Sequence, residues 1–527
     1  MSKVNMRFLF GHTASLCLYS AIAVILPVKS APATEGTLLY TSDSGFLFAL
    51  SEKATAKEIY AWVDRQKDDA GVDIYAQMVF HQGWVELFQS EFAEHDTRKK
   101  YKRLESLFAQ GIQPLNLFIE RTHHKGMKFV AAIRMNDRHG HNKKFLDAHP
   151  DWLLEEFPFG VDFSIREVRE WMFNIMNEIV QKFDVDGLDL DFMRSGHMFP
   201  RETARESHAK MTDLLRQVKT MLDATSKLKS KELSLGVRVP QTLHECRLLG
   251  LDVPTWIKEG LIDSITPSDD YFTDFNAPYE EFGELIKGTG IKMYPSIHPP
   301  VAEGYRQLNH THMSRAMYRA AVKNFYMAGA HGVSVYNYHY AWRAGWNPPR
   351  ARYVMKWLRE FKYPQKLETG DRHYAFYPLR SSPVNIRWET GYRPRAAITL
   401  DRIKTVSTGT LDLRIAEDLD PGITALMSFN AKHLGRNDRI KVELNGTEIP
   451  TAKIKRVYVS EGRKAGIHYP PMGPYSRCDF ALTSPPAVRG KNTIKVTWLG
   501  PTATGDRPAV VIPEFDVLVQ GVSEHLR

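Results

Sequence analysis

The segment Asp186-Gly187-Leu188-Asp189-Leu190-Asp191 places two carboxylates two residues apart in a β-like run. Successive side chains of a strand point to opposite faces, so Asp189 and Asp191 share a face with Gly187, and the two leucines take the other. Buried carboxylates are costly unless they are paired or used. We therefore predict that Asp191, at the end of the run, is catalytic, and that Asp189, one layer deeper, assists by orienting or tuning a neighbour.

A second acidic group follows a later β-like run, in Ser268-Asp269-Asp270-Tyr271. Glycoside hydrolysis uses two carboxyl groups, one as nucleophile or base and one as acid. If both runs end in one pocket, a carboxylate here faces Asp191, so we predict Asp269 as the catalytic partner and Asp270 as its substitute. Glu245 is a third candidate for the acid. The competing interpretation is that one of the adjacent aspartates is a helix N-cap or a loop residue.

Polar and aromatic residues at the ends of the other β-like runs are predicted to contact substrate. Arginine suits carboxylate or sulfate groups, and aromatic rings at such a site stack on sugar faces. Two alternatives stay open, because Arg134 and Arg238 could instead neutralise Asp189 and Asp191, and the rings could simply fill the core. The predicted substrate-binding set is Arg134, Asn136, Asp137, Arg194, Arg238, Asp270, Tyr294, His298, Tyr336 and Trp346.

The sequence lacks the residue patterns of zinc sites, calcium sites and serine nucleophiles. The histidines do not show a zinc-ligand spacing, no carboxylate-rich calcium loop occurs, and the GxSxG nucleophile motif is missing. We therefore expect no metal site and no cofactor.

The candidate residues lie on eight β-like runs that alternate with amphipathic helical runs. This alternation is typical of a (β/α)8 TIM barrel, whose active site lies at the C-terminal ends of the strands. An open doubly wound sheet is the competitor, but TSDSGF follows the first run where that fold carries a Gly-rich phosphate turn. We assign residues 36–362 to a catalytic barrel. The β-like runs are residues 38–40, 72–80, 128–135, 186–192, 233–239, 262–268, 291–297 and 332–338.

The pattern changes after Tyr363-Pro364, beyond which the helical period is lost. Short β-rich runs follow, and Asn445-Gly446 is a strong hairpin-turn signal. We assign residues 373–527 to an all-β sandwich. Its role is either carbohydrate binding or packing against the barrel, and packing is the preferred interpretation because no binding face is evident.

The N-terminus has the pattern of a secretory signal peptide over residues 1–33. Lys3 and Arg7 precede an apolar run from Leu16 to Val28, and Ala31-Pro32-Ala33 offers a cleavage site. We expect a secreted or periplasmic protein that does not stay in the membrane after cleavage. Cys246 and Cys478 fall in different predicted domains, so we expect no disulfide between them.

The chain carries a formal net charge of +9, with 70 Lys and Arg against 61 Asp and Glu. Basic surface of this kind is either simply solvated or suited to an anionic partner. Because no nucleic-acid module or block of basic residues occurs, we expect no nucleic-acid partner. Arg134, Arg138, Arg194 and Arg238 cluster at three predicted strand ends, and they favour an anionic glycan carrying uronate or sulfate.

Three segments together resemble the bacterial glycosyl-hydrolase-like family ten, a group of exported barrel proteins. They are DGLDLDFMR at residues 186–194, IRMND at 133–137 with HPDWL at 149–153, and WIKEGLIDSITPSDDY at 256–271. The resemblance implies a TIM barrel that hydrolyses a glycan, without specifying the linkage. The first segment also resembles chitinase-like barrels, but Met193 stands where their catalytic glutamate would be. Barrels with a nucleophile on strand four and an acid on strand six are the closer analogy, and they support pairing Asp191 with Asp269.

Two functions therefore compete. The first is a glycoside hydrolase acting on a polysaccharide or oligosaccharide. The second is a non-catalytic glycan-binding protein on the same barrel. Two carboxylates at the mouth of the barrel would favour the enzyme, and a single one would favour the binding protein.

Overall fold

The computed structural model describes residues 35–137, 139–269, 272–302, 311–338, 354–377, 398–404, 406–464, 472–500 and 508–521. The predicted signal peptide lies outside these residues. No helix within these ranges is long and apolar enough to cross a membrane. Cys246 and Cys478, the two cysteines in these ranges, are both free and buried.

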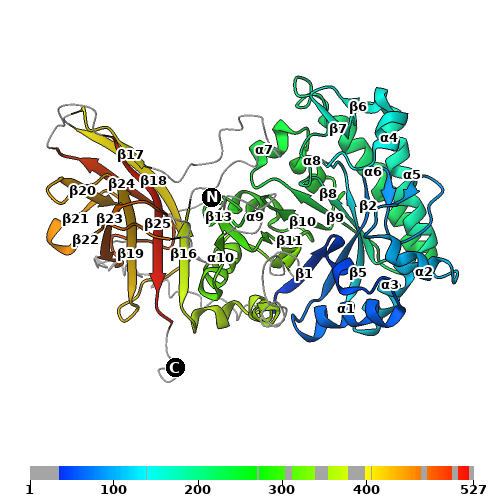
Figure 1. Ribbon diagram of the computed structural model, residues 1–527, viewed down its shortest axis with the longest axis horizontal. Helices are drawn as coiled ribbons and strands as arrows, with labels where there is room; N and C mark the ends of the chain where they lie inside the picture. The colour runs from blue at the N-terminus through cyan, green and yellow to red at the C-terminus, as the bar shows by residue number, and fades with distance from the viewer. Residues whose placement is uncertain are drawn as a thin grey trace, which may run out of the picture.

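The N-terminal part is a parallel barrel with helices around it (Figure 1). The sheet order is β11-β10-β9-β8-β5-β2-β1-β15-β12, and all these pairs are parallel. β11 and β12 are two halves of one segment, residues 292–297, which pairs with β10 on one side and β15 on the other, so the sheet closes. The strands are β1 (Thr37–Ser42), β2 (Ile74–His81), β5 (Lys128–Arg134), β8 (Gly187–Asp191), β9 (Ser234–Val239), β10 (Ser264–Pro267), β11 (Lys292–Met293), β12 (Ser296–Ile297) and β15 (Gly332–Tyr336).

Amphipathic helices cover the outside of the barrel. In α5 (Arg166–Lys182), for example, Val168, Met172 and Ile179 are fully buried, as expected for apolar residues repeated at helical spacing. Ser314 caps the last barrel helix by accepting a hydrogen bond from the backbone N–H of Met317. The other helices are α1 (Ala56–Asp68), α2 (Glu105–Phe108), α3 (Pro114–His124), α4 (Lys143–Ala148), α6 (His208–Lys229), α7 (Leu243–Leu248), α8 (Val253–Lys258), α9 (Glu280–Ile286) and α10 (Arg315–Met327).

The interior of the barrel confirms the predicted alternation along β8. Leu188 and Leu190 belong to the large core that the barrel shares with its helices. Asp189 points inward instead, since a Cβ added to Gly236 on the neighbouring strand would lie 2.9 Å from its Oδ1. A separate small apolar cluster of Ala76, Met78, Val130 and Ala132 comes from β2 and β5.

The C-terminal part consists of two antiparallel sheets, as the sequence predicts. Asn445 and Gly446 both have positive φ, 49° and 80°, as a two-residue type I′ hairpin requires. One sheet runs β16 (Arg372–Phe376), β25 (Val510–Val519), β19 (Ala425–Lys432), β23 (Tyr475–Ala481) and β22 (Lys455–Val459), with β17 (Ile398–Leu400) also on β25. The other runs β18 (Ser407–Ile415), β24 (Gly490–Trp498), β20 (Ile440–Leu444) and β21 (Thr447–Ile449).

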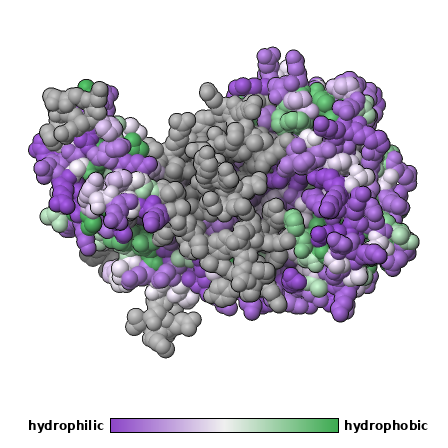
Figure 2. All heavy atoms as spheres, viewed as in Figure 1, coloured by the Kyte–Doolittle hydropathy of each residue, from purple (hydrophilic) through white to green (hydrophobic). Residues whose placement is uncertain are grey.

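The sandwich is fastened to the barrel by buried polar contacts. Glu417, which follows β18, accepts hydrogen bonds from Lys323 of α10 at 2.9 Å and from Arg372 and Tyr374 of β16 at 2.8 and 2.6 Å. Asn276, which precedes α9, bonds the backbone of Asp412 and Arg414 at 2.7 and 2.9 Å. The surface of both parts in Figure 2 is largely hydrophilic, with small separate hydrophobic spots.

Candidate active site

Asp191 is the last residue of β8 and lies at the mouth of the barrel, with its side chain only 1% exposed. The register pairs it with Arg238 of β9. Arg238 Nη1 donates to both carboxylate oxygens of Asp191 at 3.1 Å, and the backbone N–H of Met193 donates to Oδ1 at 2.8 Å. Asp191 is therefore held in one orientation by a buried ion pair.

Arg238 connects most of the predicted site. Its Nη2 donates to the backbone oxygen of Asp269 at 2.9 Å and to His298 Nε2 at 3.2 Å. Its guanidinium also lies over the ring of Tyr336, 4.3 Å from the centroid. These residues, with Arg238 itself, lie at the ends of β8, β9, β10, β12 and β15. The Arg238 side chain therefore connects residues from five of the eight strand ends.

Asp269 is buried in the loop that follows β10, with 1% exposure. Its Oδ1 accepts the backbone N–H of Phe272 at 2.9 Å, the local turn-forming contact that the alternative interpretation describes. It comes from the second strand beyond β8, with β9 between them, so it flanks Asp191 rather than facing it from the opposite wall. Asp270 and Trp346 lie outside the described residues.

Asp189 lies one layer below Asp191. Burial and the negative charge of Asp191 raise the pKa of Asp189 to about 7, against the opposing effect of Arg238. A carboxyl group with this pKa gains and loses a proton near neutral pH, directly beneath the proposed catalytic group.

A second ion-pair cluster covers the other side of the mouth. Arg134, at the end of β5, contacts Asp43 at 2.5 Å and Asp137 at 2.6 Å, and Asp137 also contacts His139 Nδ1 at 2.5 Å. Burial acts to raise the pKa of Asp43, but the guanidinium groups of Arg134 and Arg194 outweigh it and hold that pKa below its usual value. Arg134 and Arg238 are thus both neutralised by carboxylates of the protein.

Part of the barrel matches a known protein family. Residues 66–283 match the family glycosyl hydrolase-like 10. The match includes all three sequence segments that carried the resemblance, and it confirms that resemblance. A comparison with curated proteins found no match.

Solved structures with a similar course of the chain include glycoside hydrolases, at low scores. Alpha-L-fucosidase isoenzyme 2 from Paenibacillus thiaminolyticus is 13% identical with a TM-score of 0.40, over 64% of this chain and 50% of that chain, so this chain spans half of its length. The maltogenic alpha-amylase AmyB from Thermotoga neapolitana is 13% identical over 86% and 97% of the two chains, with a TM-score of 0.36. The alpha-amylase from Geobacillus thermoleovorans is 11% identical over 88% and 99%, with a TM-score of 0.37. At these scores the alignments carry no argument about activity.

Within the matched segment, Asn136 connects the backbone of two loops. Its Nδ2 donates to the backbone oxygens of Val161 and His197 at 2.9 and 2.6 Å, and its Oδ1 accepts the N–H of Val161 at 2.8 Å. Its amide is thus occupied by backbone rather than turned to a substrate.

Tyr294 does not join the predicted site. Burial raises the pKa of its phenol, and the groups that act on it are Thr37 and Asp73, at the starts of β1 and β2. Tyr294 therefore lies toward the N-terminal end of the barrel. Along the chain it falls between β11 and β12, the two halves of the seventh strand.

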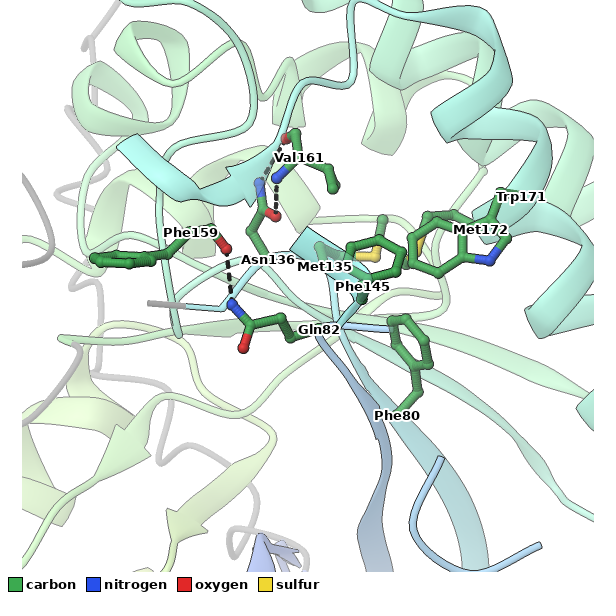
Figure 3. A pocket seen from close by; sticks show the side chains of 9 residues that line it. All are labelled: Phe80, Gln82, Met135, Asn136, Phe145, Phe159, Val161, Trp171 and Met172. Atoms are coloured by element: carbon green, nitrogen blue, oxygen red, sulfur yellow. Dashed lines mark hydrogen bonds between the residues drawn. The ribbon is translucent and has the colours of Figure 1, made fainter. Parts of the chain in front are cut away.

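A small aromatic crevice lies beside the mouth within the same segment, and the closed space in it is no larger than one water molecule. Figure 3 shows Phe80, Phe145 and Trp171 together on one side of it, and Gln82 and Asn136 bonded to neighbouring backbone. The Phe145 and Trp171 rings are stacked, with centroids 5.0 Å apart. Because these rings pack against one another and the crevice is so small, it is a gap in the packing rather than a sugar site. Its lining is Phe80, Gln82, Met135, Asn136, Phe145, Phe159, Val161, Trp171 and Met172.

Sequence reasoning missed several residues of the mouth. Asp43 follows β1, and the N–H of Asp43 donates to Asn337 Oδ1 at 2.8 Å. His81 ends β2 and contacts Glu86 at 3.1 Å. Both could have been predicted, because the site of such a barrel lies at the C-terminal ends of its strands, and Asp43 and His81 stand at the ends of the first two strands.

Proposed function

We propose that this protein is a glycoside hydrolase whose reaction is centred on Asp191, with Asp269 as the second carboxyl group. The observation that carries the proposal is the position of Arg238, which contacts the Asp191 carboxylate and the Asp269 backbone together. A carboxylate oriented in this way suits the nucleophile or base of glycoside hydrolysis, and the second carboxyl group supplies the acid. The match to the glycosyl hydrolase-like 10 family supports the same reaction class.

The proposed substrate is a polysaccharide or oligosaccharide. The ion pairs of Arg134 and Arg238 favour the interpretation in which these two arginines neutralise aspartates and do not bind an anionic sugar. Arg194 also lies near a carboxylate, because its charge helps to lower the pKa of Asp43. The proposal therefore covers neutral glycans first and anionic ones second.

A non-catalytic glycan-binding protein is the second candidate, and one specific observation favours it. Asp191 and Asp269 are each 1% exposed, and both carboxylates accept hydrogen bonds from the protein itself. A substrate could reach them only if the surrounding loops moved. In this alternative the mouth of the barrel binds sugar and no bond is cleaved.

The test is a screen of the purified protein against neutral and anionic polysaccharides, with release of reducing ends as the readout. We expect activity on at least one glycan, and its near-complete loss in Asp191→Asn. The matched control is Asp186→Asn, five residues earlier, because Asp186 lies at the other end of the barrel and is paired with His123 at 2.8 Å. Binding without cleavage would establish the second candidate, and full activity in Asp191→Asn would refute the assignment.

A further inference from the structure

The excursion that follows β2 brings together a histidine and two carboxylates. His81 ends β2, Glu86 follows β3 (Trp84–Val85), and Asp96 follows β4 (Glu94–His95). β3 pairs with both β2 and β4, which folds the excursion back on the barrel mouth. All three side chains are at most 2% exposed.

Two of the distances between these side chains are close to those around a tetrahedral cation. His81 Nε2 lies 3.1 Å from Glu86 Oε1 and 3.3 Å from Asp96 Oδ2, and one donor atom from each of the three residues lies within 4.8 Å of the others. Bonds of about 2.0–2.2 Å from zinc to nitrogen and oxygen would place neighbouring ligand atoms about 3.3–3.6 Å apart. One imidazole with two carboxylates is also a set that zinc accepts.

The hydrogen bonds among these groups are mutually incompatible. Nε2 of His81 carries either one proton or one lone pair. It lies against two carboxylate acceptors, and it also lies 2.9 Å from Arg98 Nη2, which is a donor. Whichever form the imidazole takes, at least one of these contacts is unfavourable. In addition, Glu86 Oε2 is buried and has no hydrogen-bond partner.

We propose that His81, Glu86 and Asp96 bind a divalent transition-metal ion, with zinc the best match, that holds the excursion after β2 against the barrel. A cation at this point would accept the imidazole lone pair and one oxygen of each carboxylate, which removes the conflict at Nε2. Glu86 would bind through Oε2, which has no hydrogen-bond partner, and a water molecule would complete the tetrahedron. Because all three side chains are at most 2% exposed, substrate does not reach the ion, and we assign it a structural role. This site is independent of the proposed hydrolysis.

Arg98 is the competitor for this position. It already donates from Nε to both oxygens of Asp96 at 3.0 and 2.9 Å, and it lies over the ring of Trp84 at 4.9 Å. Metal binding requires Nη2 of Arg98 to leave both His81 Nε2 and Asp96 Oδ2, while Arg98 keeps its contacts with Asp96 Oδ1. Its side chain is 24% exposed, so it has room to withdraw toward solvent. Removing its positive charge should therefore strengthen metal binding.

The test uses the full chain, stripped with a chelator and then titrated with Zn²⁺ or Co²⁺ alone. We expect one equivalent bound by elemental analysis, a tetrahedral Co²⁺ absorption band, and a rise in melting temperature on adding metal. Glu86→Gln should weaken binding. Arg98→Ala should tighten it roughly tenfold or more, since it removes a nearby like charge. If Arg98 itself is the cation that stabilises this cluster, Arg98→Ala should bind no more metal than the wild type.

The matched control is His123→Ala. His123 also lies near two aspartates, Asp186 at 2.8 Å and Asp184 at 3.7 Å, but it is partly exposed. Its removal should leave the metal content unchanged. If neither the wild-type protein nor Arg98→Ala binds an equivalent of either metal, or if Glu86→Gln binds as well as the wild type, the proposal is wrong and Arg98 is the cation of this site.

Discussion

Replacing Asp191 by Asn tests the buried ion pair at the centre of the mouth. The substitution keeps the size of the side chain and removes its charge. Arg238, with a side chain 2% exposed, would then lose the carboxylate that it contacts directly and keep Ser268 Oγ at 3.1 Å, the backbone oxygen of Asp269, His298 Nε2 and the ring of Tyr336. Removing one partner of a buried pair typically costs about 3–5 kcal/mol, because the remaining charge is out of water without a counterion.

The assay is the free energy of unfolding from urea titration, for the wild type, Asp191→Asn, Arg238→Met and the double variant. We expect each single variant to lose about 3–5 kcal/mol, and the double variant to lose clearly less than the sum, since it leaves no unpaired charge. Glu170→Gln is the control, and because its pair with Arg166 is exposed we expect a loss of about 1 kcal/mol or less. Strictly additive losses in the double variant would refute the view that Asp191 and Arg238 stabilise each other.

Two further predictions concern buried carboxyl groups. The pKa of Asp189 is about 7 in the folded protein against an ordinary 3.8, so the native state binds more protons between these values and its stability should fall as pH rises from about 4 to about 7. Asp189→Asn should flatten this slope in urea titrations at several pH values, and an unchanged slope would contradict the assignment. Glu417→Gln leaves Lys323 and Arg372 without their shared carboxylate, so we expect calorimetry to show a loss of about 3–5 kcal/mol. A melting temperature equal to that of the wild type would show that this pair contributes nothing.

The barrel was predictable because its signals are local. Each strand is a short apolar run between helices, and the period-two alternation in residues 186–191 is enough to tell the inward side chains from the outward ones. The turn at Asn445-Gly446 was equally clear, because few other residue pairs adopt positive φ twice in succession.

The partners of the charged residues were not predictable in the same way. The alternation along the strands predicted that Arg238 points into the barrel near Asp191, but it left open whether Arg238 binds substrate or neutralises an aspartate. The structure pairs the two residues in register and shows the guanidinium in contact with the carboxylate. Tyr294 was assigned to the mouth because its strand ends there, yet it lies before the break in that strand. His81, Glu86 and Asp96 are spread over residues 81–96, and an irregular excursion brings them together, so no fixed ligand spacing marks them.

The contacts of Glu417 and Asn276 bear on how this chain can be divided. The sequence changes character near residue 363, which suggests two modules that could be separated there. A barrel cut at that point would keep Lys323 but lose its counterion, and Asn276 would lose the backbone of β18. The sandwich thus forms part of the wall behind α9 and α10, and any shortened or domain-exchanged version must carry an equivalent strand and carboxylate. The sequence pattern separates the two parts, but buried polar contacts join them. We therefore expect the barrel to be stable only when it is expressed together with the sandwich.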